Sequence, residues 1–199
     1  MTETTSPLSD LTADTPSLIR LHERLSESAA AEQLLDIAYR TVDSPVGRLL
    51  VAATDAGLVR VAFEREDHDQ VLQRLADRVS SRILRSPRRL DEAARQLDEY
   101  FSGRRRNFGL PLDFRLSRGF RREVLAHLVT IGYGRTQSYT EVAGATGHPR
   151  AVRAVGSACA TNPLPVVVPC HRVLRSDGSL GGYIGGLTVK TALLALEAG

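Results

Sequence analysis

The run "PVVVPCHRV" at residues 165–173 constrains the fold more than any other stretch of this 199-residue chain. Three consecutive valines bounded by prolines predict a short buried strand, because a continuous apolar run of this kind is typical of a strand covered on both faces. Pro169 has no amide hydrogen to offer a neighbouring strand, so the strand should end there. Cys170 and His171 follow directly. The sequence therefore places a thiol and an imidazole where a buried segment ends.

The composition, 42% hydrophobic and 25% charged, is that of a globular protein with one domain or two small ones. No apolar stretch approaches the roughly 20 residues that a membrane helix needs. The N-terminus lacks the basic start and apolar core of a secretory signal, so we expect none. Two cysteines, Cys159 and Cys170, are too few for a disulfide framework or a thiolate-rich zinc site. We therefore expect a reducing, cytoplasmic setting and no membrane partner.

The charge is distributed unevenly. Residues 115–199 carry ten Arg or Lys side chains and four acidic ones, a net charge of +6, whereas residues 1–114 carry −3. A cationic half favours a polyanionic partner, because the release of phosphate counterions dominates non-specific nucleic-acid affinity. Arginine supplies 25 of the 26 cations, however, and an excess of that kind can equally reflect codon composition.

The pattern of residues 1–114 predicts an α+β arrangement. Residues 1–16 are rich in Thr, Ser, Asp and Pro and should be disordered, and residues 17–35 have weak helical spacing, so residues 1–35 form an extension. A small antiparallel sheet with helices is expected over residues 36–114. Its strands and helices are predicted from "IAYRTV", "GRLLVAAT", "GLVRVAF", "HDQVLQRLADRVSS", "SRILRS" and "PRRLDEAARQLDEYFSGRRR", followed by an extended "NFGLPLDF".

Residues 115–199 predict a mostly helical domain. Two short helices, at residues 138–147 and 148–162, are joined by a tight glycine-containing turn, and Pro149 is placed to start the second. The second helix carries Arg150 and Arg153 among small side chains, which suits a helix-turn-helix. An ordinary corner between two helices explains the pattern equally well.

A thiol, an imidazole and a carboxylate all occur within the last thirty residues, at Cys170, His171 and Glu197. Together they permit an activated cysteine, in which the carboxylate orients the imidazole and the imidazole draws the thiol proton. Three interpretations stay open from the residues alone. Cys170 could be a small core residue, the nucleophile of a Cys-His-acid hydrolase, or a nucleophile of another kind.

The segment "NPLPVVVPCHRVLRSDGSLGGYIGGLTVKTALLALE" closely resembles the signature of the O6-alkylguanine-DNA alkyltransferases. The resemblance extends upstream through "IGYGRTQSYTEVAGATGHPRAVRAVGSA" and, more loosely, over "SPVGRLLVAATDAGLVRVAF" and "LDEYFSGRRRNFGLPLDF". It spans residues 36–199. It implies a ribonuclease H-like domain over residues 36–114 and a DNA-binding and catalytic domain, with the helix-turn-helix, over residues 115–199.

The resemblance implies a role for each matching residue. Cys170 is similar to the nucleophile that receives the alkyl group, His171 would act on it through a water, and Glu197 would hold the imidazole. Asn162 matches the asparagine that braces the active-site turn. Tyr139 matches the tyrosine that helps displace the target nucleotide and protonates the departing guanine. Without the family, Glu197 would be read as a solvated charge, Asn162 as a helix stop and Tyr139 as a core residue.

The remaining assignments concern DNA and the base. Arg153 matches the arginine that intercalates where the flipped base leaves a gap, on a recognition helix expected over residues 149–160. The other DNA-contacting positions implied by the resemblance are Arg150, Tyr139, Ser157 and Ala154. Those implied for the base pocket are Tyr183, Val173, Gly185 and Gly186.

The resemblance implies stoichiometric, irreversible transfer of alkyl groups from O6 of guanine, and from O4 of thymine, to Cys170 after base flipping. Double-stranded DNA would be the partner, no cofactor would be required, and the protein would act as a monomer. Two rivals remain: a non-catalytic lesion-binding protein, against which Cys170 argues, and a thiol hydrolase, against which Arg153 and the helix-turn-helix argue. The sequence leaves open the range of alkyl groups and cooperativity on DNA.

The chain departs from family patterns in three places. Leu125 replaces a tryptophan that many relatives carry, which should affect packing. No cysteine precedes Cys159, so we expect no N-terminal zinc site, and Cys159 itself should be a small packing residue. Residues 1–35 lie outside the resemblance and have no assigned function.

Overall fold

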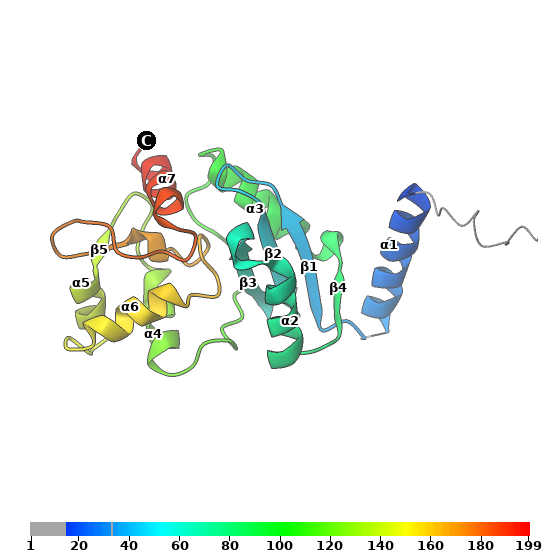
Figure 1. Cartoon of the computed structure of the whole chain (residues 1–199), viewed down its shortest axis with the longest axis horizontal. Helices are drawn as coiled ribbons and strands as arrows, with labels where there is room; N and C mark the ends of the chain where they lie inside the picture. Colours follow the sequence, from blue (N-terminus) through cyan, green and yellow to red (C-terminus); the bar gives the residue numbers. More distant parts are fainter. Residues whose placement is uncertain (1–14, 33) are drawn as a thin grey trace, which may run out of the picture.

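The computed structural model describes residues 15–32 and 34–199. A four-stranded sheet with its helices forms one half, and a mostly helical half packs beside it (Figure 1). The expected disorder of residues 1–16 falls almost wholly outside the described part. The weak helix expected over residues 17–35 is present as α1 (Thr15–Ala31), which lies at the far side of the sheet from the helical half.

The sheet has the order β3-β2-β1-β4. Its strands are β1 (Ile37–Val42), β2 (Leu49–Thr54), β3 (Gly57–Phe63) and β4 (Ile83–Arg85). The predicted antiparallel pairing and hairpin are confirmed for the first three strands, but β4 pairs parallel to β1, so the sheet is mixed. The difference arises because helix α2 (His68–Arg78) carries the chain across the sheet before β4, and a crossover of this kind brings a strand back in parallel.

Alternating side chains bury both faces of the sheet. On β2, Leu49 and Val51 join one core cluster, whereas Leu50 and Ala52 join another beneath α2. Helix α2 begins at His68 because the side chain of Asp67 accepts hydrogen bonds from the first free amides of the helix. The opposite face is covered by α3 (Asp91–Phe101), which follows the 3-10 turn η2 (Pro87–Leu90), and by the helical half.

The segment after α3 crosses from the sheet to the helical half in an extended conformation, as predicted. Leu58 donates to the carbonyl of Pro111 at 2.8 Å, and Asp113 donates to the carbonyl of Leu58 at 2.8 Å. Gly57 has a φ of +135°, and a Cβ there would overlap the Pro111 carbonyl, so only glycine permits this close approach. The crossing segment is thereby fixed against β3.

The second half contains four α-helices and a two-stranded parallel sheet among the described residues. They are α4 (Phe120–Leu128), α5 (Tyr139–Ala145), α6 (Val152–Ala160), α7 (Leu187–Ala198), β5 (Gln137–Ser138) and β6 (Val173–Leu174). Ser138 and Glu141 form a capping box that starts α5. The predicted start of the second helix at Pro149 is wrong, because residues 149–151 form a turn and α6 begins at Val152.

The valine run is buried but is a turn rather than the predicted strand. Val166 has a φ of +73°, outside the range of a strand, and the amide of Val168 donates to the carbonyl of Leu164 at 2.7 Å. Two effects favour the turn. The flanking prolines remove amide donors that a strand ladder would use, and the side chain of Asn162 bonds both ends of the turn.

Within residues 15–32 and 34–199, no helix is long and apolar enough to cross a membrane. Across the same ranges, no three or more His, Cys, Asp or Glu side chains are grouped so that they could hold a metal ion.

Candidate active site

Cys170 begins the 3-10 turn η3 (Cys170–Arg172) and is buried, with 2% of its surface exposed. The side-chain nitrogen Nδ2 of Asn162 lies 3.1 Å from the Cys170 sulfur and 2.8 Å from the carbonyl oxygen of Val168, and it donates to both. The amide oxygen of Asn162 accepts from the backbone of Leu164 at 2.9 Å. One fully buried side chain therefore fixes the valine turn and holds the thiol at its end.

His171 points away from this asparagine, toward the last helix. Its Nε2 atom lies 2.9 Å from Oε1 of Glu197, and both side chains are buried. An ionised carboxylate can only accept hydrogen bonds, so Nε2 carries the hydrogen and Nδ1 is left as an acceptor. Nδ1 is buried without a hydrogen-bond partner among the described residues. Burial lowers the pKa of His171, which keeps the imidazole neutral and this nitrogen free.

Glu197 accepts hydrogen bonds from three further groups. Arg172 approaches it in a fork, with Nε 2.8 Å from Oε2 and Nη2 2.8 Å from Oε1. The hydroxyl of Tyr100 donates to Oε1 at 2.7 Å, and the amide of Gly134 donates to Oε2 at 3.3 Å. Burial alone would favour the neutral acid, but the hydrogen bonds from His171 and Arg172 outweigh it and hold the pKa of Glu197 far below its usual range. The carboxylate is therefore ionised.

Tyr100 is a site residue that the sequence analysis missed. It belongs to α3 of the sheet half, is fully buried, and places its hydroxyl 3.5 Å from Nε2 of His171. Burial, followed by the charge of Glu197, raises the pKa of Tyr100 strongly, so its hydroxyl remains a donor. The quoted segment "LDEYFSG" contains this tyrosine, but helical spacing predicts only that its ring is buried and not which carboxylate its hydroxyl reaches.

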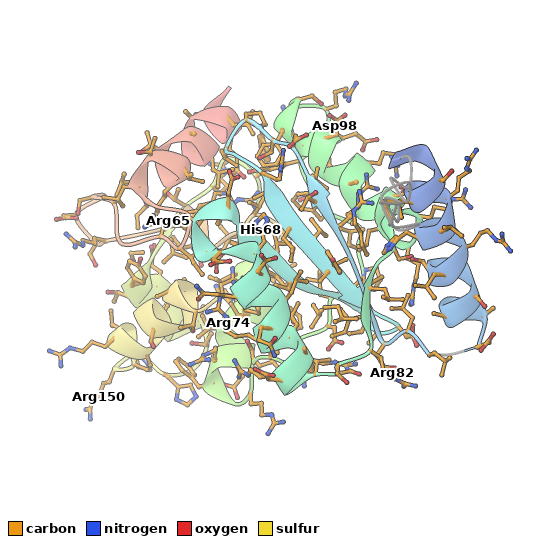
Figure 2. The ribbon with its side chains drawn as sticks, turned by 45° about the vertical axis from the view of Figure 1, so that its right-hand side comes forward. Arg65, His68, Arg74, Arg82, Asp98 and Arg150 are labelled. Carbon is orange, nitrogen blue, oxygen red and sulfur yellow. The ribbon has the colours of Figure 1, made fainter. Side chains whose placement is uncertain are left out.

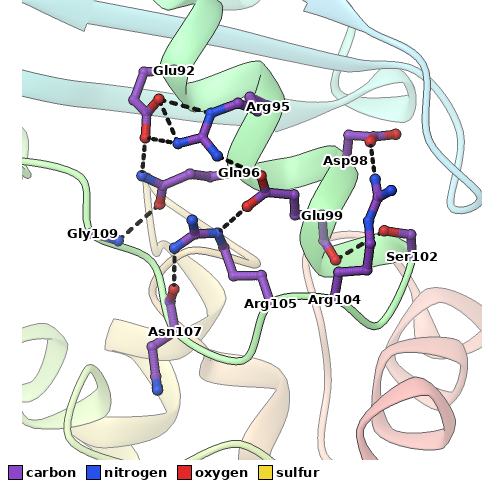
Figure 3. Close-up of polar contacts among 10 residues, drawn as sticks. All are labelled: Glu92, Arg95, Gln96, Asp98, Glu99, Ser102, Arg104, Arg105, Asn107 and Gly109. Atoms are coloured by element: carbon purple, nitrogen blue, oxygen red, sulfur yellow. Dashed lines mark hydrogen bonds and ion pairs between the residues drawn. The ribbon is translucent and has the colours of Figure 1, made fainter.

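The exposed face of α3 is held by a polar network that fixes this helix (Figure 3). Arg95 bridges Glu92 and Glu99, each of which lies one turn away from it, and Arg105 of the following loop donates to Glu99 at 2.8 Å. Gln96 accepts from the backbone of Gly109 at 2.8 Å, which ties the helix to the crossing segment. The network steadies the helix that presents Tyr100 to the site.

Lys190 is a second missed residue. It is the one lysine in a chain with 25 arginines, and it is fully buried. Its Nζ donates to the carbonyl of Val173 at 2.6 Å and reaches that of Gly181 at 3.4 Å. Burial lowers its pKa. A lone lysine in an otherwise arginine-rich chain is a signal that sequence reasoning could have used, because the compact ammonium fits where a guanidinium does not.

Of the predicted pocket residues, Tyr183 lies beside His171. The ring of Tyr183 packs edge-on against that of His171, with the ring centroids 6.3 Å apart, and against that of Phe63, with the ring centroids 5.7 Å apart. A Cβ on Gly185 would lie 2.9 Å from the Phe63 ring, and Gly186 has a φ of +91°, so neither position accepts a side chain without displacement. Val173, on β6, is fully buried and pairs with Gln137.

Tyr139 is the first residue of α5 and is half-buried. Its hydroxyl packs against Gly181 so closely that a side chain at Gly181 would overlap it. Burial, followed by the nearby thiols of Cys159 and Cys170, raises the pKa of Tyr139 to about 12. The phenol is therefore protonated at neutral pH and can donate a proton in the vicinity of the glycine-rich loop.

Three of the predicted DNA-contacting residues lie on one exposed stripe of α6. Arg153, Ala154 and Ser157 are exposed, whereas Val155, Ala158 and Cys159 on the other side are buried. Arg150 projects into solvent from the turn before the helix (Figure 2). The structure thus separates these residues from the buried thiol, and Cys159 packs in the core as expected.

The thiol of Cys170 is protonated in this structure. Burial raises its pKa to about 11, although the hydrogen bond from Asn162 and the charge of Lys190 act in the opposite direction. The sequence permits a thiol that its neighbours activate. In the closed site Cys170 is not activated in this way, because burial raises its pKa by more than Asn162 and Lys190 lower it. No hydrogen bond joins Cys170 to His171 among the described residues.

Comparison with known proteins identifies the family. The ribonuclease-like domain of 6-O-methylguanine DNA methyltransferase matches residues 37–114, and the DNA binding domain of that protein matches residues 119–199. A methylated-DNA--protein-cysteine methyltransferase of Mycolicibacterium paratuberculosis is 43% identical over 161 residues, which cover 81% of this chain and 92% of the relative. The chain belongs to the 6-O-methylguanine DNA methyltransferase family.

Other members of the family are similar over the same extent. The constitutive methylated-DNA--protein-cysteine methyltransferase of Bacillus subtilis is 38% identical, with 80% of this chain and 94% of the relative covered. The crystal structure of the Mycobacterium tuberculosis O6-methylguanine methyltransferase matches with a TM-score of 0.70 at 38% identity, covering 81% of this chain and 93% of that one. The structure of Mycobacterium tuberculosis OGT in complex with DNA matches with a TM-score of 0.68 at 38% identity, covering 81% and 92%. The family resemblance stated from the sequence is confirmed.

The Glu197 network makes a prediction for stability in acid. Glu197→Gln leaves Arg172 buried without a counter-charge and should cost about 3–5 kcal/mol at neutral pH. Because the pKa of Glu197 is lowered on folding, its contribution is fully present above the unfolded value of about 4.3 and is lost as the pH falls below it. Urea unfolding of both proteins should therefore show the difference shrinking from pH 6 to pH 3.

Glu123→Gln is the matched control, since Glu123 is an exposed carboxylate on α4. It should change the free energy of unfolding by less than about 0.5 kcal/mol. A Glu197→Gln deficit that stays constant or grows in acid would contradict an ionised, hydrogen-bonded carboxylate.

Proposed function

We propose that this protein repairs alkylated DNA by transferring an alkyl group from O6 of guanine, and from O4 of thymine, to the sulfur of its own Cys170. The observation that carries the proposal is a buried thiol held by Asn162 and followed directly by a histidine that a buried carboxylate orients. In a chain of this family, that arrangement suits a nucleophile which needs water excluded and its neighbours fixed before the substrate arrives.

The chemistry follows from the protonation states. The thiol proton passes through a water to Nδ1 of His171, the free acceptor, and Glu197 stabilises the imidazolium that forms. The thiolate then displaces guanine at the alkyl carbon, so a carbon–sulfur bond forms as the carbon–oxygen bond breaks. The electron pair passes to the guanine, which gains a proton from Tyr139. Water and ordinary reductants do not reverse a thioether, so each molecule reacts once.

The base must leave the duplex to reach the thiol. Extrusion of one nucleotide costs a few kcal/mol, which contacts elsewhere on the DNA must supply. Duplex DNA docks on the exposed stripe of α6, with Ala154 and Ser157 allowing a close approach and Arg150 contacting a phosphate. Arg153 fills the gap in the base stack. The extruded base enters between Tyr183 and the glycines that follow it, with Val173 on the opposite side.

The folded part of the chain is divided into two domains. Residues 36–114 form the ribonuclease H-like domain, residues 115–199 form the DNA-binding and catalytic domain, and residues 1–35 are an extension to which no function is assigned. The protein acts as a monomer and requires no cofactor, because the base, the acid and the nucleophile are all side chains of one chain.

Cys170→Ser tests whether transfer and DNA binding are separate. Serine has nearly the shape of cysteine but ionises far less readily, so transfer from a duplex containing O6-methylguanine should fall below detection. DNA affinity should stay within about twofold of the wild type, since α6 does not involve the thiol. Transfer is measured with a radiolabelled methyl group, and affinity by fluorescence anisotropy. Detectable transfer by the variant would place the nucleophile elsewhere, and a large loss of affinity would contradict the separation.

Arg153→Ala tests the intercalating role. Repair of the duplex should fall by roughly tenfold or more, because unstacking is no longer compensated. Reaction with free O6-methylguanine, which needs no base held out, should be unchanged. Arg24→Ala, an exposed arginine on α1, serves as the control for loss of one charge. Equal losses on duplex and free base would argue against intercalation.

A further inference from the structure

A cavity of about 300 Å³ lies between the sheet half and the helical half. We call it the arginine cleft, because four of the residues that line it are Arg60, Arg74, Arg78 and Arg121. Arg74 and Arg78 belong to α2, Arg121 to the first turn of α4, and Arg60 to β3. Figure 2 shows Arg74 on the side of α2 that faces α6. Cations from both halves therefore meet at one opening.

The charges of the arginine cleft are only partly neutralised. Arg60 forms an ion pair with Glu66, the one acidic residue that lines the cavity, and donates to the carbonyl of Pro163 at 3.2 Å. Within the described ranges, Arg74, Arg78 and Arg121 form no ion pair with any side chain. Arg74 donates to the backbone carbonyl of Glu66 at 3.4 Å. Like charges four residues apart on one helix face repel each other, so an anion here would relieve a strain of the free protein.

The arginine cleft continues the proposed DNA surface. The exposed stripe of α6 that carries Arg153, Ala154 and Ser157 extends at its C-terminal end to Ala160 and Thr161. Both of these residues line the arginine cleft. A duplex that lies along the stripe therefore passes the cleft with its backbone. The cleft also includes Ile184, the residue after Tyr183, and so borders the base pocket.

We propose that the arginine cleft binds backbone phosphate of the same duplex that docks on α6, so that α2 of the sheet half is part of the DNA interface. The proposal rests on the proposed function, because it takes the stripe of α6 as the DNA surface. Guanidinium groups suit this ligand, since their planar forks match phosphate oxygens in a bidentate way. Arg74 and Arg78 contact the phosphate directly. Arg60 does not contact it, because it is paired with Glu66, and instead stabilises the β3 side of the cleft.

The test uses the full chain with Arg74→Gln and Arg78→Gln combined. The matched control combines Arg20→Gln with Arg24→Gln, two exposed arginines at the same spacing on α1, on the far side of the sheet. Affinity for a duplex with one O6-methylguanine is measured by fluorescence anisotropy from 50 to 200 mM salt. Each lost phosphate contact makes the negative slope of log K against log salt less steep by about 0.9. We expect a slope whose magnitude is smaller by about 1 to 2 and affinity roughly 5- to 20-fold weaker at 100 mM salt.

Three comparisons make the outcome specific. The control should match the wild type in slope and affinity, and Arg74→Lys combined with Arg78→Lys should keep most of the affinity because the charge is retained. Reaction with free O6-methylguanine should be unchanged in the glutamine variant, which shows that the site is intact. Equal slopes in wild type, variant and control would overturn the proposal, as would equal losses on duplex and free base.

Failure of the proposed function gives a different result. A wild-type protein that accepts no alkyl group from either substrate refutes alkyl transfer, but the salt slopes still decide whether the arginine cleft contacts DNA.

Discussion

The buried carboxylate of Glu197 is the group on which the rest of the site depends. It accepts hydrogen bonds from four residues in three segments of the chain: His171 and Arg172 of η3, Tyr100 of α3 and Gly134 of the loop after α4. A buried charge destabilises a protein by several kcal/mol unless it is paired and fully hydrogen-bonded. The ion is tolerated only when these segments are all in place. The network therefore couples the assembly of both halves of the molecule to the orientation of one imidazole.

That orientation gives the site its chemistry. Glu197 holds Nε2 of His171, so Nδ1 remains a free acceptor, while Asn162 holds the thiol from the opposite side of the same turn. The two hydrogen-bond networks meet at the peptide bond between Cys170 and His171. Because the thiol is buried and its pKa is raised to about 11, the resting protein keeps its nucleophile protonated. Protection of the thiol suits a protein whose cysteine is consumed by a single reaction.

Local patterns in the sequence predicted much of the fold and some of the site. Alternating apolar residues located the strands β1 to β3, whereas Asn162 and Glu197 were placed beside Cys170 and His171 only through the family resemblance. The valine run was misread because its turn depends on the Asn162 side chain, a contact that apolar patterning does not reveal. Tyr100 was missed for a related reason. Its partner Glu197 is 97 residues away, and local spacing carries no information about such contacts.

The central claim is that Cys170 receives one alkyl group and then cannot react again. The direct test mixes the wild-type protein with increasing amounts of a duplex that carries one O6-methylguanine and maps the modified peptide by mass spectrometry. The account predicts a gain of one methyl group on Cys170 that saturates at one per protein molecule. A protein that binds the lesion tightly yet gains no methyl group, or one that gains it on another residue, would contradict the account.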